Sequence, residues 1–406
     1  GSHALGSVGS TATLAALYSG FLIGMGAGVN VLTARFIGAR EEENTRQTVH
    51  TSAVVCLGLG LILMALCFSL ARPLLTLLGT KDELIDGAIL YLRIYAFGLP
   101  AMALYNFGSA VLTATGDTKR PLLFLSIAGG LNICLNLFFV IVCKMAADGV
   151  ALATIISQYT SAALVLRVLL RAQESYRLEL KNFVFSGEKA QRILALGVAS
   201  GMQHAIFAIA NLFIQSAVNS FSAAVVEGNS AAANADSLVY EVMAAPYTAC
   251  STFISQNYGA RSRTRIQESI RTGWLLHLGM AVFFSAVAVL SSPLTMRLFS
   301  SDPAVLAEAR QFILHISSCY VLFSSVEVLS SSMRGVGNAV KPAVITFFAV
   351  CVLRMALLFT VTFPHLSVLT ISICYPVTWA ASSVLFILYY KFGRWMPRYP
   401  ESAKSE

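Results

Sequence analysis

The chain has 406 residues, of which 56% are hydrophobic and only 12% are charged, and its mean hydropathy is +0.72. A water-soluble domain carries roughly 25% charged residues, so this composition excludes an ordinary soluble enzyme. The net charge of +8 could indicate a nucleic-acid partner, but the basic residues gather in alternate loops between apolar runs, which argues against that partner.

Eleven apolar runs follow one another along the chain. The run at residues 53–71 has no charged residue and is long enough to cross roughly 30 Å of hydrocarbon as a helix. The runs do not alternate apolar and polar residues as the strands of a β-barrel would. We therefore predict an all-α polytopic membrane protein, with spans near residues 11–33, 53–71, 88–113, 121–143, 147–166, 193–219, 228–255, 273–293, 309–333, 343–362 and 366–390.

The two halves of the chain repeat one another at an offset of 221 residues. Gly38-Ala39-Arg40 aligns with Gly259-Ala260-Arg261, and residues 116–121 align with 337–342. A single offset held over more than 100 residues indicates a duplicated unit. We expect Gly38 and Gly259 to end their helices in a left-handed turn, followed by an arginine at the level of the lipid headgroups.

Both of these basic loops fall on the same side of the predicted membrane, because six spans separate them. The halves are therefore predicted to be parallel repeats, related by an axis along the membrane normal. Most of the 28 lysine and arginine residues lie in this set of loops and in the C-terminal tail, which predicts a cytoplasmic C-terminus.

The second half contains a span at 193–219 that has no partner in the first half. We therefore expect that one helix, of roughly 30–40 residues with its flank, precedes residue 1, and that the intact protein has a 6+6 arrangement. The predicted domains are an N-lobe with five of its six helices, a cytoplasmic inter-lobe linker, a C-lobe with six helices and a cytoplasmic tail, at residues 1–171, 172–190, 191–391 and 392–406.

Away from the ends of the predicted spans, three acidic residues fall inside them: Asp236, Glu241 and Glu327. An ionised carboxylate at the centre of a membrane helix costs roughly 2.5–3.5 kcal/mol, so such residues are candidates for function. Each could carry a proton, and Asp236 or Glu327 could bind Na⁺ with neighbouring oxygen atoms. The structural alternative is an acid that is hydrogen-bonded between helices or reaches the surface, and for Glu241 the two interpretations are equally favoured.

Several uncharged polar residues could line a substrate cavity. Asn132 and Asn136 share one helical face, and Thr154 follows on the next span. Gln203, His204, Asn211 and Gln215 recur at roughly helical spacing along the span at 193–219. Amides and hydroxyls between membrane helices often only hold the helices together, and that alternative stays open.

The sequence contains none of the H-E-x-x-H, Walker A or G-x-S-x-G motifs. We therefore predict that the protein is not an enzyme and uses no cofactor other than H⁺ or Na⁺ as a coupling ion.

Several segments resemble the MATE (multidrug and toxic compound extrusion) family, its bacterial members most of all: TARFIGAR, NFGSAVLTATGDTKRP, GVALATIISQ, FISQNYGAR and VEVLSSSMRGVGNAVKP. The resemblance implies two six-helix bundles around a central cavity. It also implies export of organic cations and amphipathic drugs in exchange for H⁺ or Na⁺, by alternating access. A monomer in the bacterial inner membrane is the corresponding expectation.

The resemblance also implies roles for particular residues. Asn132, Asn136 and Thr154 match polar positions of the family's first lobe, and Asp236 and Glu327 match acids on the eighth and tenth helices. Phe207 stands where many members have a glutamate on the seventh helix, and Glu241 is unusual for the family.

Two other functions are open to a membrane protein of this kind. A lipid-linked oligosaccharide flippase of similar architecture would need a strongly basic cavity, but away from the span ends only Arg93 and Arg354 lie inside spans. The sequence does not identify a partner for Arg354. The protein could also be a channel or a receptor. In a flux assay, a transporter would show saturation and countertransport, whereas a channel or receptor would show neither.

Overall fold

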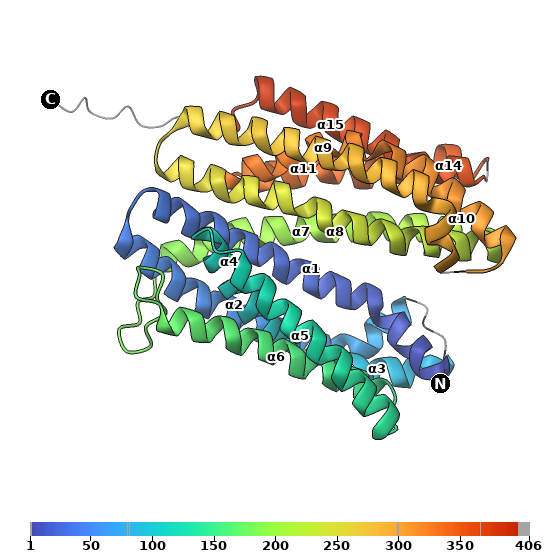
Figure 1. Cartoon of the computed structure of the whole chain (residues 1–406), viewed down its shortest axis with the longest axis horizontal. Helices are drawn as coiled ribbons and strands as arrows, with labels where there is room; N and C mark the ends of the chain where they lie inside the picture. Colours follow the sequence, from blue (N-terminus) through green and yellow to red (C-terminus); the bar gives the residue numbers. More distant parts are fainter. Residues whose placement is uncertain (1, 79, 81, 299, 366, 397–406) are drawn as a thin grey trace. The chain divides into compact units, whose positions relative to one another are not determined.

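The computed structural model describes residues 2–78, 80, 82–298, 300–365 and 367–396, and all regular elements within this part are helices (Figure 1). The prediction of an all-α fold is confirmed. The described chain forms two compact units, Gly1–Ala205 and Ile206–Glu406, and the division between them falls inside one helix. Of the predicted C-terminal tail, residues 397–406 lie outside the described residues.

The first unit contains six helices and the beginning of a seventh among its described residues, and α5 continues into a π-helical segment at Phe138–Val142. In order they are α1 (Ser2–Gly38), α2 (Glu42–Leu77), α3 (Asp82–Ala96), α4 (Leu99–Ala114), α5 (Lys119–Leu137), α6 (Ala147–Arg171) and α7 (Gly187–Val218). Helices α3 and α4 are bent by 45° at the break between them, the geometry of a broken span or of a re-entrant loop.

The second unit begins within α7. Its further α-helices are α8 (Ala223–Gly259), α9 (Arg263–Thr295), α10 (Pro303–Ile316), α11 (Tyr320–Gly335), α12 (Val340–Thr346), α13 (Leu353–Leu357), α14 (Val368–Ser372) and α15 (Cys374–Phe392). π-Helical segments at Phe347–Val352 and Leu358–Thr362 join the short helix α13 to its neighbours.

The helix bounds reproduce the sequence repeat. At the offset of 221, α1 corresponds to α8 and α4 to α11 at both ends, and α2, α3 and α5 begin where α9, α10 and α12 begin. Helix α6 corresponds to α14 and α15 together, and α7 has no counterpart among residues 2–171. The structure therefore supports the duplication.

The left-handed residues also repeat, but not at the predicted glycines. Helices α1 and α8 end at Gly38 and Gly259, and the positive φ angles lie two residues later, at Arg40 (58°) and Arg261 (56°). In the first turn, the amide of Arg40 donates to Ile37 O and that of Glu41 to Phe36 O, both at 3.0 Å. These bonds define a Schellman motif, so the prediction about the glycines is wrong: each arginine itself closes the helix.

One of the predicted spans is not apolar throughout. Within the described residues, nine helices are long and apolar enough to cross a membrane, or ten if the bent pair α3–α4 is counted as one span. Helix α8, predicted as the span at 228–255, is not among them. The expectation of eleven apolar spans is therefore wrong for α8, whose polar side chains lower its hydropathy.

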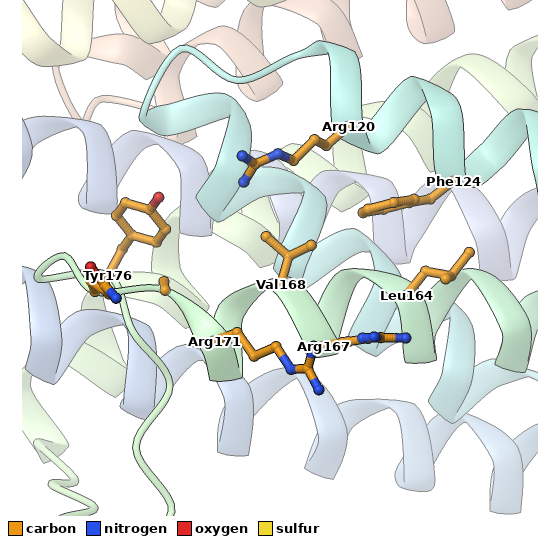
Figure 2. Close-up of a pocket in the computed structure, with 9 residues that line it drawn as sticks. Arg120, Phe124, Leu164, Arg167, Val168, Arg171 and Tyr176 are labelled. Carbon is orange, nitrogen blue, oxygen red and sulfur yellow. The ribbon is translucent and has the colours of Figure 1, made fainter.

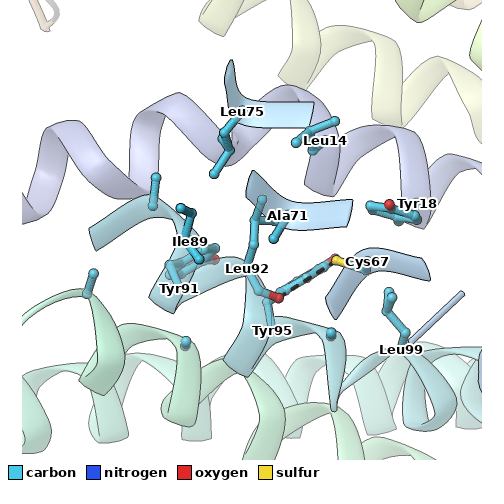
Figure 3. Packing of buried hydrophobic residues seen from close by; sticks show 14 of the residues in the cluster. Leu14, Tyr18, Cys67, Ala71, Leu75, Ile89, Tyr91, Leu92, Tyr95 and Leu99 are labelled. Atoms are coloured by element: carbon cyan, nitrogen blue, oxygen red, sulfur yellow. Dashed lines mark hydrogen bonds between the residues drawn. The ribbon is translucent and has the colours of Figure 1, made fainter. Parts of the chain in front are cut away.

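The first unit packs around side chains that α1, α2 and α3 contribute to a common core (Figure 3). Leu14 and Tyr18 meet Ala71 and Leu75, and the thiol of Cys67 donates to Leu92 O at 3.7 Å. Because lipid is as apolar as these side chains, such contacts stabilise the bundle through close packing.

The segment between α6 and α7 lies against α2. Its residues 172–186 form no helix, and the ring of Phe183 stacks on that of His50 at 4.9 Å. The amide of Val184 donates to His50 Nδ1 at 3.2 Å, and that of Ser186 donates to Thr51 Oγ1 at 3.1 Å. These contacts fix the segment at the end of the first unit.

Candidate functional site

Asp236 lies where α8 packs against α11. Its side chain is half-buried, and Oδ1 accepts a hydrogen bond from the hydroxyl of Tyr320. The hydroxyl of Ser317 donates to the Tyr320 oxygen at 3.2 Å. The carboxyl group is thus held by a buried phenol, an arrangement that can bind and release a small cation without the acid being left unpaired.

Glu327 lies seven residues after Tyr320, on the same face of α11. It is only 6% exposed, and Tyr240 of α8 forms a hydrogen bond with its carboxyl group. A further hydrogen bond links Tyr240 to Tyr247, one heptad along α8. The charge of Arg334 also acts on Glu327. Asp236 and Glu327 therefore occupy one helix interface, each with a tyrosine as its partner.

Aromatic rings fill the space around these two acids. Trp379 of α15 lies 5.2 Å from Phe323 and 6.3 Å from Tyr320, measured between ring centroids. Phe323 also contacts the rings of Tyr240 and Phe207, each at 6.1 Å. The faces of such rings attract organic cations, and their bulk excludes water from the acids.

Arg354 is buried in the same unit, with 1% of its surface exposed. Its Nη1 donates to Asn211 Oδ1 at 2.8 Å, its Nη2 donates to Thr378 Oγ1 at 3.1 Å, and its guanidinium lies 4.6 Å from the ring centre of Tyr375. Among the described residues it forms no ion pair, and its Nε has no hydrogen-bond partner. An amide, a hydroxyl and an aromatic ring are thus the partners that the sequence did not identify.

Glu241 lies on another face of α8 and is exposed. It belongs to a row of exposed polar residues spaced by three, four or seven positions: Ser230, Asn234, Ser237, Glu241 and Thr248. This spacing places all of them on one side of the helix. In a membrane protein, an exposed polar face along a helix indicates contact with water or with a polar ligand.

The two asparagines that were predicted as site residues in the first unit bond to each other. Asn136 Nδ2 donates to Asn132 Oδ1 at 3.0 Å, and Asn136 Oδ1 is buried without a partner among the described residues. The hydroxyl of Thr154 donates to Val150 O at 2.9 Å and also bonds with Tyr91 of α3. The structure therefore pairs the two asparagines but directs Thr154 toward α3.

Comparison with known proteins identifies the chain. The family model described as MatE matches residues 1–138 and 199–360. The chain belongs to the MatE family. Members of this family are membrane transporters, which confirms that the protein is a multi-pass transporter and not an enzyme.

The similarity to other MatE proteins covers nearly the whole chain. "Probable multidrug resistance protein YoeA" of Bacillus subtilis is 27% identical over 97% of this chain and 86% of its own length. "Probable multidrug resistance protein YpnP" of the same organism is 28% identical over 97% of this chain and 88% of its own. A solved structure of MATE in complex with MaL6 matches with a TM-score of 0.90 and 21% identity, over 96% of this chain and 88% of that chain.

The predicted polar residues of α7 in this MatE chain fall in both units. Gln203 is 5% exposed and belongs, with His204, to the first unit. Asn211 and Gln215 belong to the second unit, where Asn211 bonds Arg354 and Gln215 accepts from Asn229 Nδ2 at 3.3 Å. Within the second unit, Asn211 and Gln215 thus bond to other polar side chains of that unit.

The sequence interpretation missed the buried aromatic partners of the acids. Composition alone favours tyrosines at the lipid boundary, whereas Tyr240, Tyr247 and Tyr320 lie inside the second unit. The heptad spacing of Tyr240 with Tyr247, and of Tyr320 with Glu327, is a signal that could have placed them on the acid-bearing faces.

Proposed function

We propose that this transporter is a cation-coupled antiporter that exports organic cations and amphipathic drugs, with H⁺ or Na⁺ as the coupling ion. The names of its relatives as multidrug resistance proteins support the substrate class. The observation that carries the coupling proposal is the pair of acids at the α8–α11 interface, Asp236 and Glu327, each hydrogen-bonded by a tyrosine.

The coupling would follow from the bonds that these acids make. When ionised, Asp236 accepts the hydrogen bond of Tyr320; when an ion neutralises the carboxyl group, that bond weakens and the α8–α11 packing can change. An ion that binds one state of the protein more tightly shifts the population toward it, and a substrate that favours the other state moves against the ion. Within the described residues, no group of three or more His, Cys, Asp or Glu side chains is placed to hold a metal ion. A bound Na⁺ would therefore need hydroxyl and carbonyl oxygens in addition to one carboxylate.

We propose in addition where the transporter is located and that it acts as a monomer. A monomer in a bacterial cytoplasmic membrane, with its C-terminus in the cytoplasm, fits the excess of basic residues in one set of loops.

The proposal is tested by ethidium efflux from proteoliposomes under separate H⁺ and Na⁺ gradients. We expect Asp236→Asn and Glu327→Gln each to reduce gradient-driven efflux at least tenfold, because neither side chain can then bind and release the ion. Glu268→Gln is the matched control, since Glu268 is an exposed acid in the first turns of α9, close to the loop that follows α8. Asp236→Glu should restore part of the activity.

Efflux that still follows the gradient in the double variant Asp236→Asn/Glu327→Gln would reject these acids as the coupling site. Efflux that neither saturates nor drives countertransport would reject an antiporter in favour of a channel. The flippase alternative gains no support from the second unit, whose deeply buried Arg354 is already bonded to Asn211 and Thr378.

A further inference from the structure

A basic cavity opens in the first unit, between the start of α5 and the end of α6 (Figure 2). It has a volume of about 540 Å³. Phe124, Leu164 and Val168 form its apolar wall. The polar part consists of three arginines, from both helices, and of two residues from the segment after α6: Arg120, Arg167, Arg171, Gln173 and Tyr176.

The positive charge of this cavity is only partly neutralised. Arg120 pairs with Asp117, at 3.2 Å between Nε and Oδ2. Arg167 and Arg171 form no ion pair within the described parts of the chain. They lie one turn apart on the same face of α6, so their positive charges are close to each other. Like charges at this spacing destabilise a helix, so an anion between them would relieve a repulsion.

The neighbouring polar groups are hydrogen-bond donors. Burial raises the pKa of Tyr176, so its hydroxyl keeps its proton at neutral pH and can donate. Figure 2 shows Tyr176 on the segment that follows α6, across the cavity from the α5 side chains. The side-chain amide of Gln173 offers a further donor. Arginine forks, a phenol and an amide suit the oxygens of a phosphate group.

The cavity also lies at the level of a membrane surface, because it stands at the ends of two predicted spans, Lys119–Val142 and Ala147–Arg171. On the side of α5 next to Arg120, Leu123 and Ile127 are apolar and exposed. A ligand that fits both features has a phosphate at the surface and hydrocarbon chains that can lie along α5. A free phosphate would make no use of the apolar surface.

We propose that this cavity binds the phosphodiester headgroup of an anionic phospholipid, with Arg167 and Arg171 as the principal ligands. Basic pockets between membrane helices are suited to such headgroups. The cavity's volume lies within the range of small-molecule sites, roughly 300–1,000 Å³. This site is separate from the acids of the second unit, so its existence does not depend on the transport mechanism.

The test is native mass spectrometry of the full chain, released from detergent with equal amounts of phosphatidylglycerol and phosphatidylcholine. We expect the unmodified protein to retain phosphatidylglycerol preferentially. Each arginine near an anionic lipid contributes about a fivefold factor in affinity, so Arg167→Gln/Arg171→Gln should weaken retention by roughly 25-fold. Arg167→Lys/Arg171→Lys keeps the charge but loses the planar fork, and should fall between the two.

The matched control is Arg192→Gln/Arg265→Gln, which removes two exposed arginines outside the cavity and changes the net charge equally. Equal losses in the two double variants would overturn the proposal, because retention would then depend on total charge alone. Inorganic phosphate is titrated in a parallel arm. The proposal of a lipid ligand would also be overturned if millimolar phosphate displaced phosphatidylglycerol completely and bound to the protein as tightly as the lipid does.

Discussion

Among single residues, Arg354 shows how a charge is held inside the second unit without an acid. Its Nη atoms donate to Asn211 and Thr378, and the ring of Tyr375 covers its plane. Thr378 does not depend on the arginine, because its own hydroxyl donates to Cys374 O at 2.8 Å. Asn211 is exposed and can find other partners. The guanidinium of Arg354 therefore depends on these two hydrogen bonds more than Asn211 and Thr378 depend on Arg354.

This asymmetry predicts opposite results for two substitutions. Arg354→Met keeps the volume and removes a buried charge, so we expect the free energy of unfolding to be unchanged or increased. Asn211→Leu leaves Nη1 without its acceptor, so it should destabilise the protein by about 1–3 kcal/mol. Both are measured by denaturant titration in mixed micelles. A larger loss for Arg354→Met than for Asn211→Leu would show that the arginine organises the unit in a way its bonds do not reveal.

Among elements, the helix ends show how the duplicated halves use the same turn chemistry. Gly116 and Gly337 follow α4 and α11 with φ angles of 93° and 92°. In the first turn the amide of Asp117 donates to Leu112 O, and in the second that of Asn338 donates to Met333 O. Both closures are Schellman motifs, as are those at Arg40 and Arg261.

Gly116→Ala should therefore destabilise the protein by about 1 kcal/mol, because an alanine disfavours this left-handed conformation. A Cβ at Gly116 meets no heavy atom within 4 Å, so the cost comes from the backbone alone. Gly129→Ala is the matched control: it also meets nothing within 4 Å but lies inside α5, where alanine favours the helix by roughly 0.5–1 kcal/mol. Unfolding in mixed micelles should give changes of opposite sign, and a common sign would contradict this explanation.

The elements were predictable from the sequence where their signals were local. Apolar runs located the spans, and the offset of 221 residues matched the helices of one half with those of the other. The left-handed residue after α1 was misplaced, because glycine is the usual choice and the bonds at Arg40 form only in the folded turn. The π-helical segments around α13 had no recognisable signal in the sequence.

At the scale of the whole molecule, the sequence predicted the family and the fold but not the surroundings of the acids. Asp236 and Glu327 are recognisable because a carboxyl group inside a span is costly. Their tyrosine partners depend on how α8 and α11 pack, and Glu241 is separated from them only by its exposed position in the structure. The heptad spacing in the sequence could place the tyrosines on the acid-bearing faces, but it does not say which two helices pack together.

The exposed polar row of α8 leads to a prediction for the assembled transporter in its membrane. Ser230 and Ser237 should face water during transport, whereas Val282 of α9, which is 54% exposed, belongs to an apolar surface that should face lipid. A cysteine reacts as its thiolate, which forms readily only in contact with water.

The probes are Ser230→Cys and Ser237→Cys, in a background with the native cysteines replaced by alanine, and Val282→Cys is the control. We expect a charged, membrane-impermeant thiol reagent to label the two α8 variants at least tenfold faster than Val282→Cys. Ethidium should slow the labelling if it occupies the same polar surface as a transported substrate. Equal rates for all three variants would mean that the polar row of α8 is not in contact with water, and a transported substrate would then have to cross along another surface.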